Sequence, residues 1–120
     1  MLYALLIHAP ESDTPPDPAV LEKVMARHRA VQDETRAAGN YVGSFRLSPS
    51  KTARTVQLGS NGPLVTDGPF AETKELLAGF YLIECTDDAE AARHAELLCG
   101  SPHDRVEIRP VMWRSDKPGS

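Results

Sequence analysis

Several predicted strands follow one another in the middle of the chain without a helix between them, and this order constrains the fold most. Residues 41–47 alternate apolar and polar side chains, and residues 53–58 form a short strand that turns back at Asn61-Gly62. Residues 78–86 are almost wholly apolar. A doubly wound parallel sheet needs strands and helices in strict alternation, so this order predicts an antiparallel sheet with an inserted hairpin instead.

The N-terminal third predicts a strand followed by a long helix. Leu2–Ile7 is an unbroken apolar run, typical of a strand covered on both faces. Asp17 is a predicted N-cap, Pro18 suits the first helical position, and Gly39 suits the C-terminal end. Apolar and small residues spaced by three and four predict a helix face that packs on a sheet. These residues are Leu21, Val24, Met25, His28, Val31, Thr35 and Ala38.

The C-terminal third predicts a second helix and a last strand. Asp87 and Glu90 form a capping pair ahead of a helix over about 88–99, and residues 105–113 form the final strand. The order strand, helix, strand pair, strand, helix, strand fits a split βαβ arrangement. We therefore predict an α+β, ferredoxin-like fold in which two helices cover one face of an antiparallel sheet.

The second face of this sheet needs a cover of its own. In Leu2–Ile7 and Phe80–Ile83, the side chains that point to either face of the sheet are apolar. Apolar side chains therefore also lie on the face away from the helices. A second copy of the chain is the simplest cover. We predict a homodimer packed sheet to sheet, with a small-molecule cavity lined partly from that face.

Composition narrows the classes of partner. The chain has 120 residues, which suits one domain, and a net charge of −4 without a Lys or Arg cluster, which argues against direct nucleic-acid binding. Its longest apolar run is far below the roughly 20 residues of a membrane span, and it has no secretory signal pattern. Cys85 and Cys99 predict reduced, buried thiols in a cytoplasmic protein.

The segment "VTDGPFAETKE", residues 65–75, contains tight-turn chemistry. Asp67 can bond a backbone amide two residues on, Gly68 is free in φ, and Pro69 fixes the next bend. Phe70 then takes a fixed direction, and residues 72–75 predict a short charged helical segment. From the residues alone, a rigid corner held by Phe70 and a ligand-binding turn both remain open.

The contiguous sequence "DGPFAETKE", residues 67–75, resembles the signature of the DGPF family of YCII-related domain proteins. The similar layout extends to "MLYALLI", to a helix His eleven residues before a Gly, to "LAGFYLIE" and to "VEIRPV". It covers residues 1–113 as a single domain and leaves 114–120 as a flexible tail. The resemblance implies a dimeric, ferredoxin-like domain of the dimeric α/β-barrel kind, bacterial and cytoplasmic.

The resemblance also implies acid–base chemistry by a helix histidine and a nearby aspartate, and one related branch eliminates chloride from an aromatic ring compound. His28 matches that histidine by its distance from Gly39. The family aspartate two residues before the glycine is replaced here by Ala37. Asp67 is the candidate replacement if the motif turn lies against the first helix.

Physical chemistry alone leaves two interpretations of His28. It lies on the apolar helix face, so burial favours a neutral imidazole that is able to act as a base near pH 7. The alternative is a core histidine that is satisfied by one hydrogen bond.

Charged residues on the strands form a further candidate binding site. Glu107 and Arg109 project from one side of the last strand, and with Arg46 they suit a small anionic substrate or, alternatively, an interfacial salt bridge. His8, His94 and His103 have no metal-ligand spacing, so neither a metal nor another cofactor is predicted.

Three function classes follow. The first is a small-molecule enzyme in which His28 is the general base of a proton-transfer or elimination reaction and Asp67 or another carboxylate orients it. The second is a ligand-binding or regulatory module, because relatives encoded beside sigma factors suggest a protein partner in transcription. The third is a structural dimer in which the motif only fixes the fold.

Overall fold

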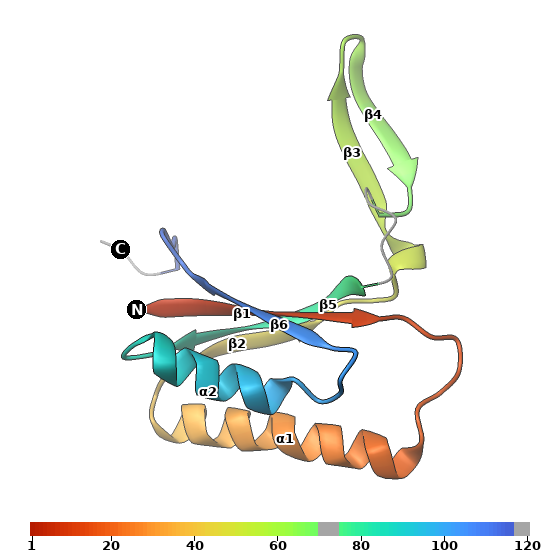
Figure 1. Cartoon of the computed structure of the whole chain (residues 1–120). Coiled ribbons are helices and arrows are strands. Elements are labelled where there is room, and N and C mark those ends of the chain that lie inside the picture. Colours follow the sequence, from red (N-terminus) through yellow and green to blue (C-terminus); the bar gives the residue numbers. More distant parts are fainter. Residues whose placement is uncertain (70–74, 117–120) are drawn as a thin grey trace.

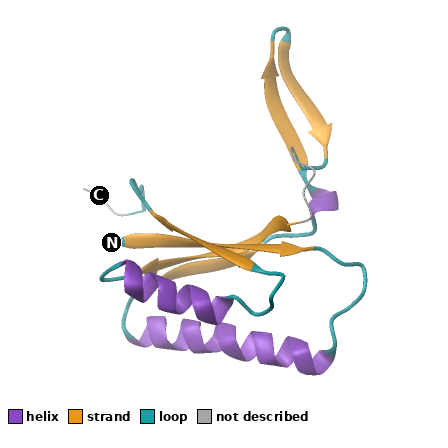
Figure 2. Cartoon of the chain, in the orientation of Figure 1, coloured by secondary structure: helices purple, strands orange, loops and turns teal. Residues whose placement is uncertain are grey.

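The computed structural model of the chain describes residues 1–69 and 75–116. Within these residues, four strands form an antiparallel sheet in the order β2-β5-β1-β6, and β3 pairs with β4 in a separate hairpin. Both helices pack on one face of the sheet (Figures 1 and 2), which confirms the ferredoxin-like α+β fold. The elements are β1 (Leu2–Pro10), α1 (Pro18–Ala37), β2 (Tyr41–Arg46), a 3-10 turn (Ser50–Thr52), β3 (Arg54–Gly59), β4 (Gly62–Asp67), β5 (Glu75–Glu84), α2 (Asp88–Leu98) and β6 (Arg105–Pro110).

The ends of α1 follow the predicted capping residues. Asp17 Oδ1 accepts a hydrogen bond from the Ala19 amide at 2.8 Å, and Pro18 occupies the first turn. Gly39 has φ 73°, a left-handed conformation that glycine adopts without strain, and its amide donates to Arg36 at 3.0 Å. Both predicted boundaries of this helix are confirmed.

The predicted apolar face of α1 is buried only over its C-terminal half. Val31 and Thr35 are buried and His28 is half-buried, whereas Leu21 and Met25 are exposed. The cause is length, because α1 has 20 residues and α2 has 11, so the first turns of α1 extend beyond α2 (Figure 1). The prediction that Leu21 and Met25 face the core is wrong for the single chain, as is the same prediction for Ala38, the exposed C-cap residue.

Two arginines fasten the helices to each other. Arg27 of α1 donates to the carbonyl oxygens of Glu96 and Leu97 at 2.7 and 2.8 Å. These are carbonyls of the last turn of α2, which lack partners inside the helix. Arg93 of α2 forms a two-pronged ion pair with Glu34 of α1 at 3.0 and 3.1 Å. The pair of helices therefore forms one layer.

The sheet has a covered face and an open face. Tyr3, Leu5, Tyr81 and Ile83 face the helices and form the core with other buried residues. Their strand neighbours Ala4, Leu6, Phe80 and Leu82 point the other way, because successive side chains alternate. We call the surface built by these four residues and their neighbours the open face, because neither α1 nor α2 covers it (Figure 2).

Two sequence predictions need correction at the ends of strands. Glu75 is the first residue of β5 and not part of a helix; Phe70 and the rest of that predicted helical segment lie outside the described residues. The last strand ends at Pro110, and Met112 and Trp113 are exposed. Proline has no amide hydrogen, and after Pro110 a backbone bond follows from the Val111 amide to the Leu2 carbonyl oxygen at 2.9 Å.

The β3–β4 hairpin rises from the open side of the sheet, opposite the helices (Figure 1). Its two turn residues are Ser60 and Asn61, one position earlier than predicted, because Gly62 already pairs with Gly59; Gly62, at φ 112°, is the first residue of β4. Both strands are almost wholly exposed, and Leu58 is 88% exposed. Within the described part of the chain, no helix is long and apolar enough to cross a membrane.

We expect Gly79→Ala to destabilise the sheet, because a Cβ at this position would lie 2.4 Å from the Phe45 carbonyl oxygen. A backbone atom cannot move aside cheaply, so the expected loss is about 1–3 kcal/mol in the free energy of unfolding by urea. Gly43→Ala is the matched control, because its Cβ would meet only the Phe45 ring, at 3.1 Å. Equal losses in the two variants would contradict this explanation.

Candidate functional site

His28 lies on the side of α1 that faces the sheet, where it contacts Tyr81 of β5. Its Nδ1 lies 2.8 Å from the Tyr81 hydroxyl oxygen, and the two ring centroids are 5.6 Å apart. The imidazole is half-buried, whereas Tyr81 is buried in the core. One of the two ring nitrogens is therefore fixed by a specific partner.

Gln32 lies one helical turn after His28 and binds the same hydroxyl. Its amide nitrogen donates to the Tyr81 oxygen at 2.8 Å. Residues four apart share a helix face, which explains why both side chains reach one atom. Ser44 of β2 pairs with Tyr81 across the sheet, and its hydroxyl lies 2.5 Å from that of Tyr41. A chain of polar groups therefore runs from α1 into β2.

The hydrogen bonds of the Tyr81 hydroxyl determine which ring nitrogen of His28 carries the proton. Because Gln32 donates to the Tyr81 oxygen, the hydroxyl proton of Tyr81 is free to point to either His28 or Ser44. If it points to Ser44, His28 donates from Nδ1 and keeps the lone pair on Nε2. This second arrangement is the one that leaves His28 able to accept a proton from a bound molecule.

Two opposite charges act on His28. Burial lowers the pKa of His28 below its ordinary value; Asp104 raises it and Arg46 lowers it to smaller extents. Burial also raises the pKa of Asp104, while His103 and His28 counteract that rise. The carboxylate coupled to His28 is therefore Asp104, in the loop between α2 and β6.

Asp67 does not lie beside His28 within one chain. It is the last residue of β4, whose hairpin stands on the open side of the sheet, whereas α1 lies on the covered side (Figure 1). Asp67 is exposed, and the turn after it is held by a hydrogen bond from the Gly68 amide to the Ala53 carbonyl at 2.8 Å. The structure thus separates the two predicted catalytic groups.

The predicted binding residues also fall into two groups. Arg46 pairs with Gly79 across the sheet, which puts it on the same face as Tyr81. Glu107 and Arg109 pair with Leu6 and Ala4, so they lie on the open face. There Glu107 Oε1 lies 3.3 Å from His8 Nε2, and Glu107 Oε2 lies 4.0 Å from Arg109 Nε, both within one chain. Phe70 lies outside the described residues.

Three residues of this site were not identified from the sequence. Gln32 had a usable signal, because it follows His28 by one helical turn. Tyr81 lies in a predicted apolar strand, and the sequence does not show that its hydroxyl points towards the first helix. Asp104 had no local signal, because the packing of the α2–β6 loop alone brings it near α1.

Metal-ligand chemistry is found elsewhere in the described part of the chain. A single cluster of His, Cys and acidic residues there is compact enough for a metal ion, and it comprises Cys85, Glu90 and His94. His28 is not a member. The His28 site therefore offers acid–base and anion-binding groups.

We expect the stability of the protein to fall as the pH decreases from about 7 towards 5. An unfolded histidine titrates near 6.5, whereas the buried His28 has a lower pKa, so the unfolded chain binds more protons in this range. His28→Gln should reduce the loss, measured as urea unfolding free energies at the two pH values. His94, whose pKa is also lowered by burial, contributes with the same sign.

The matched control for this titration is the exposed His103, changed to Gln. Glutamates titrate mainly below about 4.5 and therefore contribute outside this window. A His28→Gln protein that loses as much stability between pH 7 and 5 as the parent would contradict the assigned burial of the imidazole.

Comparison with known proteins agrees with this architecture. The YCII-related domain model matches residues 1–113. An uncharacterised protein of Rhizobium meliloti (strain 1021) is 40% identical over 114 residues, which cover 92% of this chain and 92% of that protein. The chain therefore belongs to the YCII-related domain family.

Proposed function

We propose that this protein is a small-molecule enzyme in which His28 acts as a general base and acid in a proton-transfer or elimination reaction. The observation that carries the proposal is a half-buried imidazole that lies 2.8 Å from the Tyr81 hydroxyl and on which Arg46 and Asp104 act with opposite charges. A core histidine that only fills space does not need this set of partners.

The proposed reaction begins with His28 neutral. Burial lowers its pKa, so the imidazole is mostly unprotonated at pH 7 and its Nε2 accepts a proton from the substrate. Asp104 then stabilises the imidazolium, and Tyr81 keeps the ring oriented through Nδ1. The same proton returns to the product or to a leaving group, so the enzyme ends the cycle unchanged.

The substrate class follows from the cation at the site. Arg46 is a permanent positive charge that presents several donors to a carboxylate or to a developing anion. We infer a small anionic substrate that loses a proton next to its acidic or electron-withdrawing group. Asp104 takes the orienting role that the sequence suggested for Asp67, and Asp67 remains a proposed part of the motif turn that identifies the DGPF branch of the family.

The proposed active form is a homodimer packed through the open face. Phe45 is 56% exposed on that face, and the centroid of its ring lies 5.3 Å from the centroid of the Phe80 ring. Glu107 and Arg109 lie on the same face and would border the seam. A second copy removes this apolar surface from water. The free Cys85 and Cys99 suit a reducing compartment such as the cytoplasm.

Loss of His28 is expected to remove turnover. The parent and a His28→Gln variant are screened against small carboxylic acids, including halogenated aromatic ones, by proton release and product analysis. For any substrate found, kcat/KM should fall about 10²–10⁴-fold in His28→Gln and fall clearly in Asp104→Asn. Asp33→Asn, which changes an exposed carboxylate on α1, is the control and should keep full activity.

Tyr81→Phe separates orientation from chemistry in the same assay. It keeps the ring but removes the hydroxyl that binds Nδ1, so kcat should fall while KM changes little. A substrate that is turned over equally well by the parent and by His28→Gln would exclude His28 as the base. A tight ligand that is never turned over would instead indicate a binding module.

The dimer is tested by replacing one exposed aromatic residue. Phe45→Lys should convert the dimer to a monomer in size-exclusion chromatography with light scattering, because it places a charge on the apolar seam. Val20→Lys is the matched control, since Val20 is similarly exposed, at 53%, but lies on α1. A monomeric parent protein at micromolar concentration would disprove the proposed assembly.

A further inference from the structure

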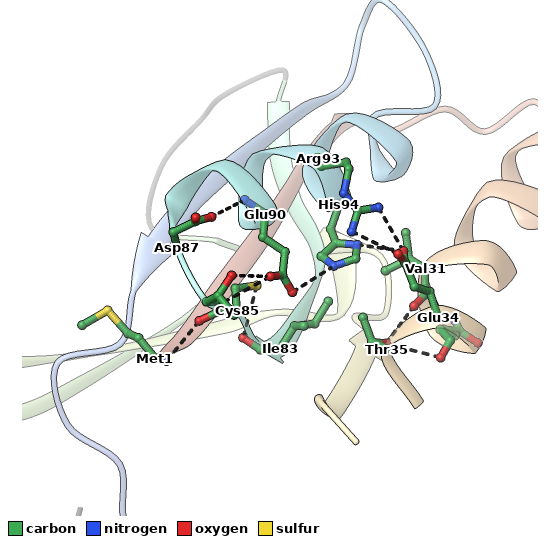
Figure 3. Close-up of polar contacts among 12 residues, drawn as sticks. Met1, Val31, Glu34, Thr35, Ile83, Cys85, Asp87, Glu90, Arg93 and His94 are labelled. Atoms are coloured by element: carbon green, nitrogen blue, oxygen red, sulfur yellow. Dashed lines mark hydrogen bonds and ion pairs between the residues drawn. The ribbon is translucent and has the colours of Figure 1, made fainter. Parts of the chain in front are cut away.

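Three potential metal ligands converge where β5 meets α2. Cys85 follows the last residue of β5, Glu90 lies in the first turn of α2, and His94 lies one turn later (Figure 3). One ligand atom from each residue lies within 4.8 Å of the other two. Cys85 and His94 are buried, whereas the Glu90 side chain is partly exposed. This cluster is separate from the His28 site and does not depend on the function proposed for it.

We propose that Cys85, Glu90 and His94 form a binding site for a zinc ion. Thiolate sulfur, imidazole nitrogen and carboxylate oxygen are the three kinds of ligand that zinc accepts in proteins. A thiolate and a carboxylate carry two negative charges, which a divalent cation neutralises. The softness of the thiolate favours zinc over magnesium or calcium, which prefer oxygen ligands.

His94 is already oriented as a ligand. Its Nε2 faces Glu90 Oε1 at 4.0 Å, and its Nδ1 faces Glu34 Oε2 at 3.7 Å. Although the side chain is almost fully buried, Nδ1 has no hydrogen-bond partner among the described residues. Metal-bound histidines usually donate their second ring N–H to a carboxylate, and Glu34 occupies that position. A proton on Nδ1 leaves the Nε2 lone pair to the metal.

The surrounding residues hold both carboxylates in place. Glu90 Oε2 accepts hydrogen bonds from the Thr86 hydroxyl at 2.6 Å and from the Thr86 amide at 3.3 Å, so Oε1 is the oxygen that faces His94. Glu34 is held by its two-pronged ion pair with Arg93. Figure 3 shows Glu34, Glu90 and Arg93 around the His94 imidazole. The outer partners that a metal site requires are therefore in place.

Binding replaces the proton of the Cys85 thiol. Among the described residues, the buried Cys85 sulfur makes one weak hydrogen bond, in which its S–H donates to the Ile83 carbonyl oxygen at 3.9 Å. When the cation enters, the S–H bond breaks, a sulfur–zinc bond forms, and the proton leaves to solvent. No electron is transferred, and the ion stays divalent.

The geometry needs only a small adjustment. Zinc holds its ligand atoms at about 2.0–2.3 Å, which puts neighbouring ligands about 3.3–3.8 Å apart in a tetrahedron. The three ligand atoms lie within 4.8 Å of one another, so a contraction of about 1 Å brings them to these separations. Three protein ligands leave a fourth position for water, on the side where Glu90 reaches solvent.

The direct test is titration of the full chain with Co²⁺, which binds at zinc sites and absorbs visible light when it is bound there. We expect stoichiometric uptake with tetrahedral d–d bands and a thiolate charge-transfer band, all displaced by Zn²⁺. Cys85→Ser should abolish the charge-transfer band. Cys99→Ser should keep it, because Cys99 is the other cysteine and is not part of the cluster.

Two further variants test the site in case Cys85→Ser does not fold. Glu90→Gln keeps an oxygen acceptor for Thr86 but removes the ligand charge, and Glu34→Gln removes the carboxylate behind His94. Each should weaken Co²⁺ binding about 10–100-fold while the apo protein stays folded by circular dichroism. No cobalt spectrum in the parent protein, or the same spectrum in Cys85→Ser or Glu90→Gln, would overturn the site.

Discussion

The hydrogen-bonded position of β1 between β5 and β6 is the constraint on which the rest of the structure depends. This strand is apolar on both faces, so its two sets of side chains each need a cover. The helices cover Tyr3 and Leu5, which fixes the direction in which Tyr81 of β5 points, because Leu5 and Tyr81 pair across the ladder. The central strand therefore determines where a polar group can enter the core.

That polar group is the Tyr81 hydroxyl, and burying it has consequences for α1. A buried hydroxyl without a partner is costly, so His28 and Gln32 satisfy it from one face of the helix. The same contacts that stabilise the core also orient the imidazole. The structural role of His28 and the acid–base role proposed for it are thus combined in one residue, on which the charges of Arg46 and Asp104 act in opposite directions.

Local rules were sufficient to predict most of the fold. Asp17, Gly39 and Asp87 marked helix boundaries because capping depends on a few neighbouring residues. The site was less predictable, since Asp104 reaches His28 only through the packing of a loop. The cluster of Cys85, Glu90 and His94 was not predicted for a similar reason. Its residues come from the end of a strand and from two turns of a helix, and their spacing matches no compact zinc motif.

The exposed β3–β4 hairpin has a consequence for how the protein becomes ordered. An isolated two-stranded ribbon is only marginally stable in water, and this one presents Leu58 and Val56 to solvent. Its backbone amides are protected mainly by the bonds that the two strands make with each other. The folding of the four-stranded sheet with its helices and the ordering of the β3–β4 hairpin are therefore separable events. The hairpin gains further rigidity from contacts outside its own two strands.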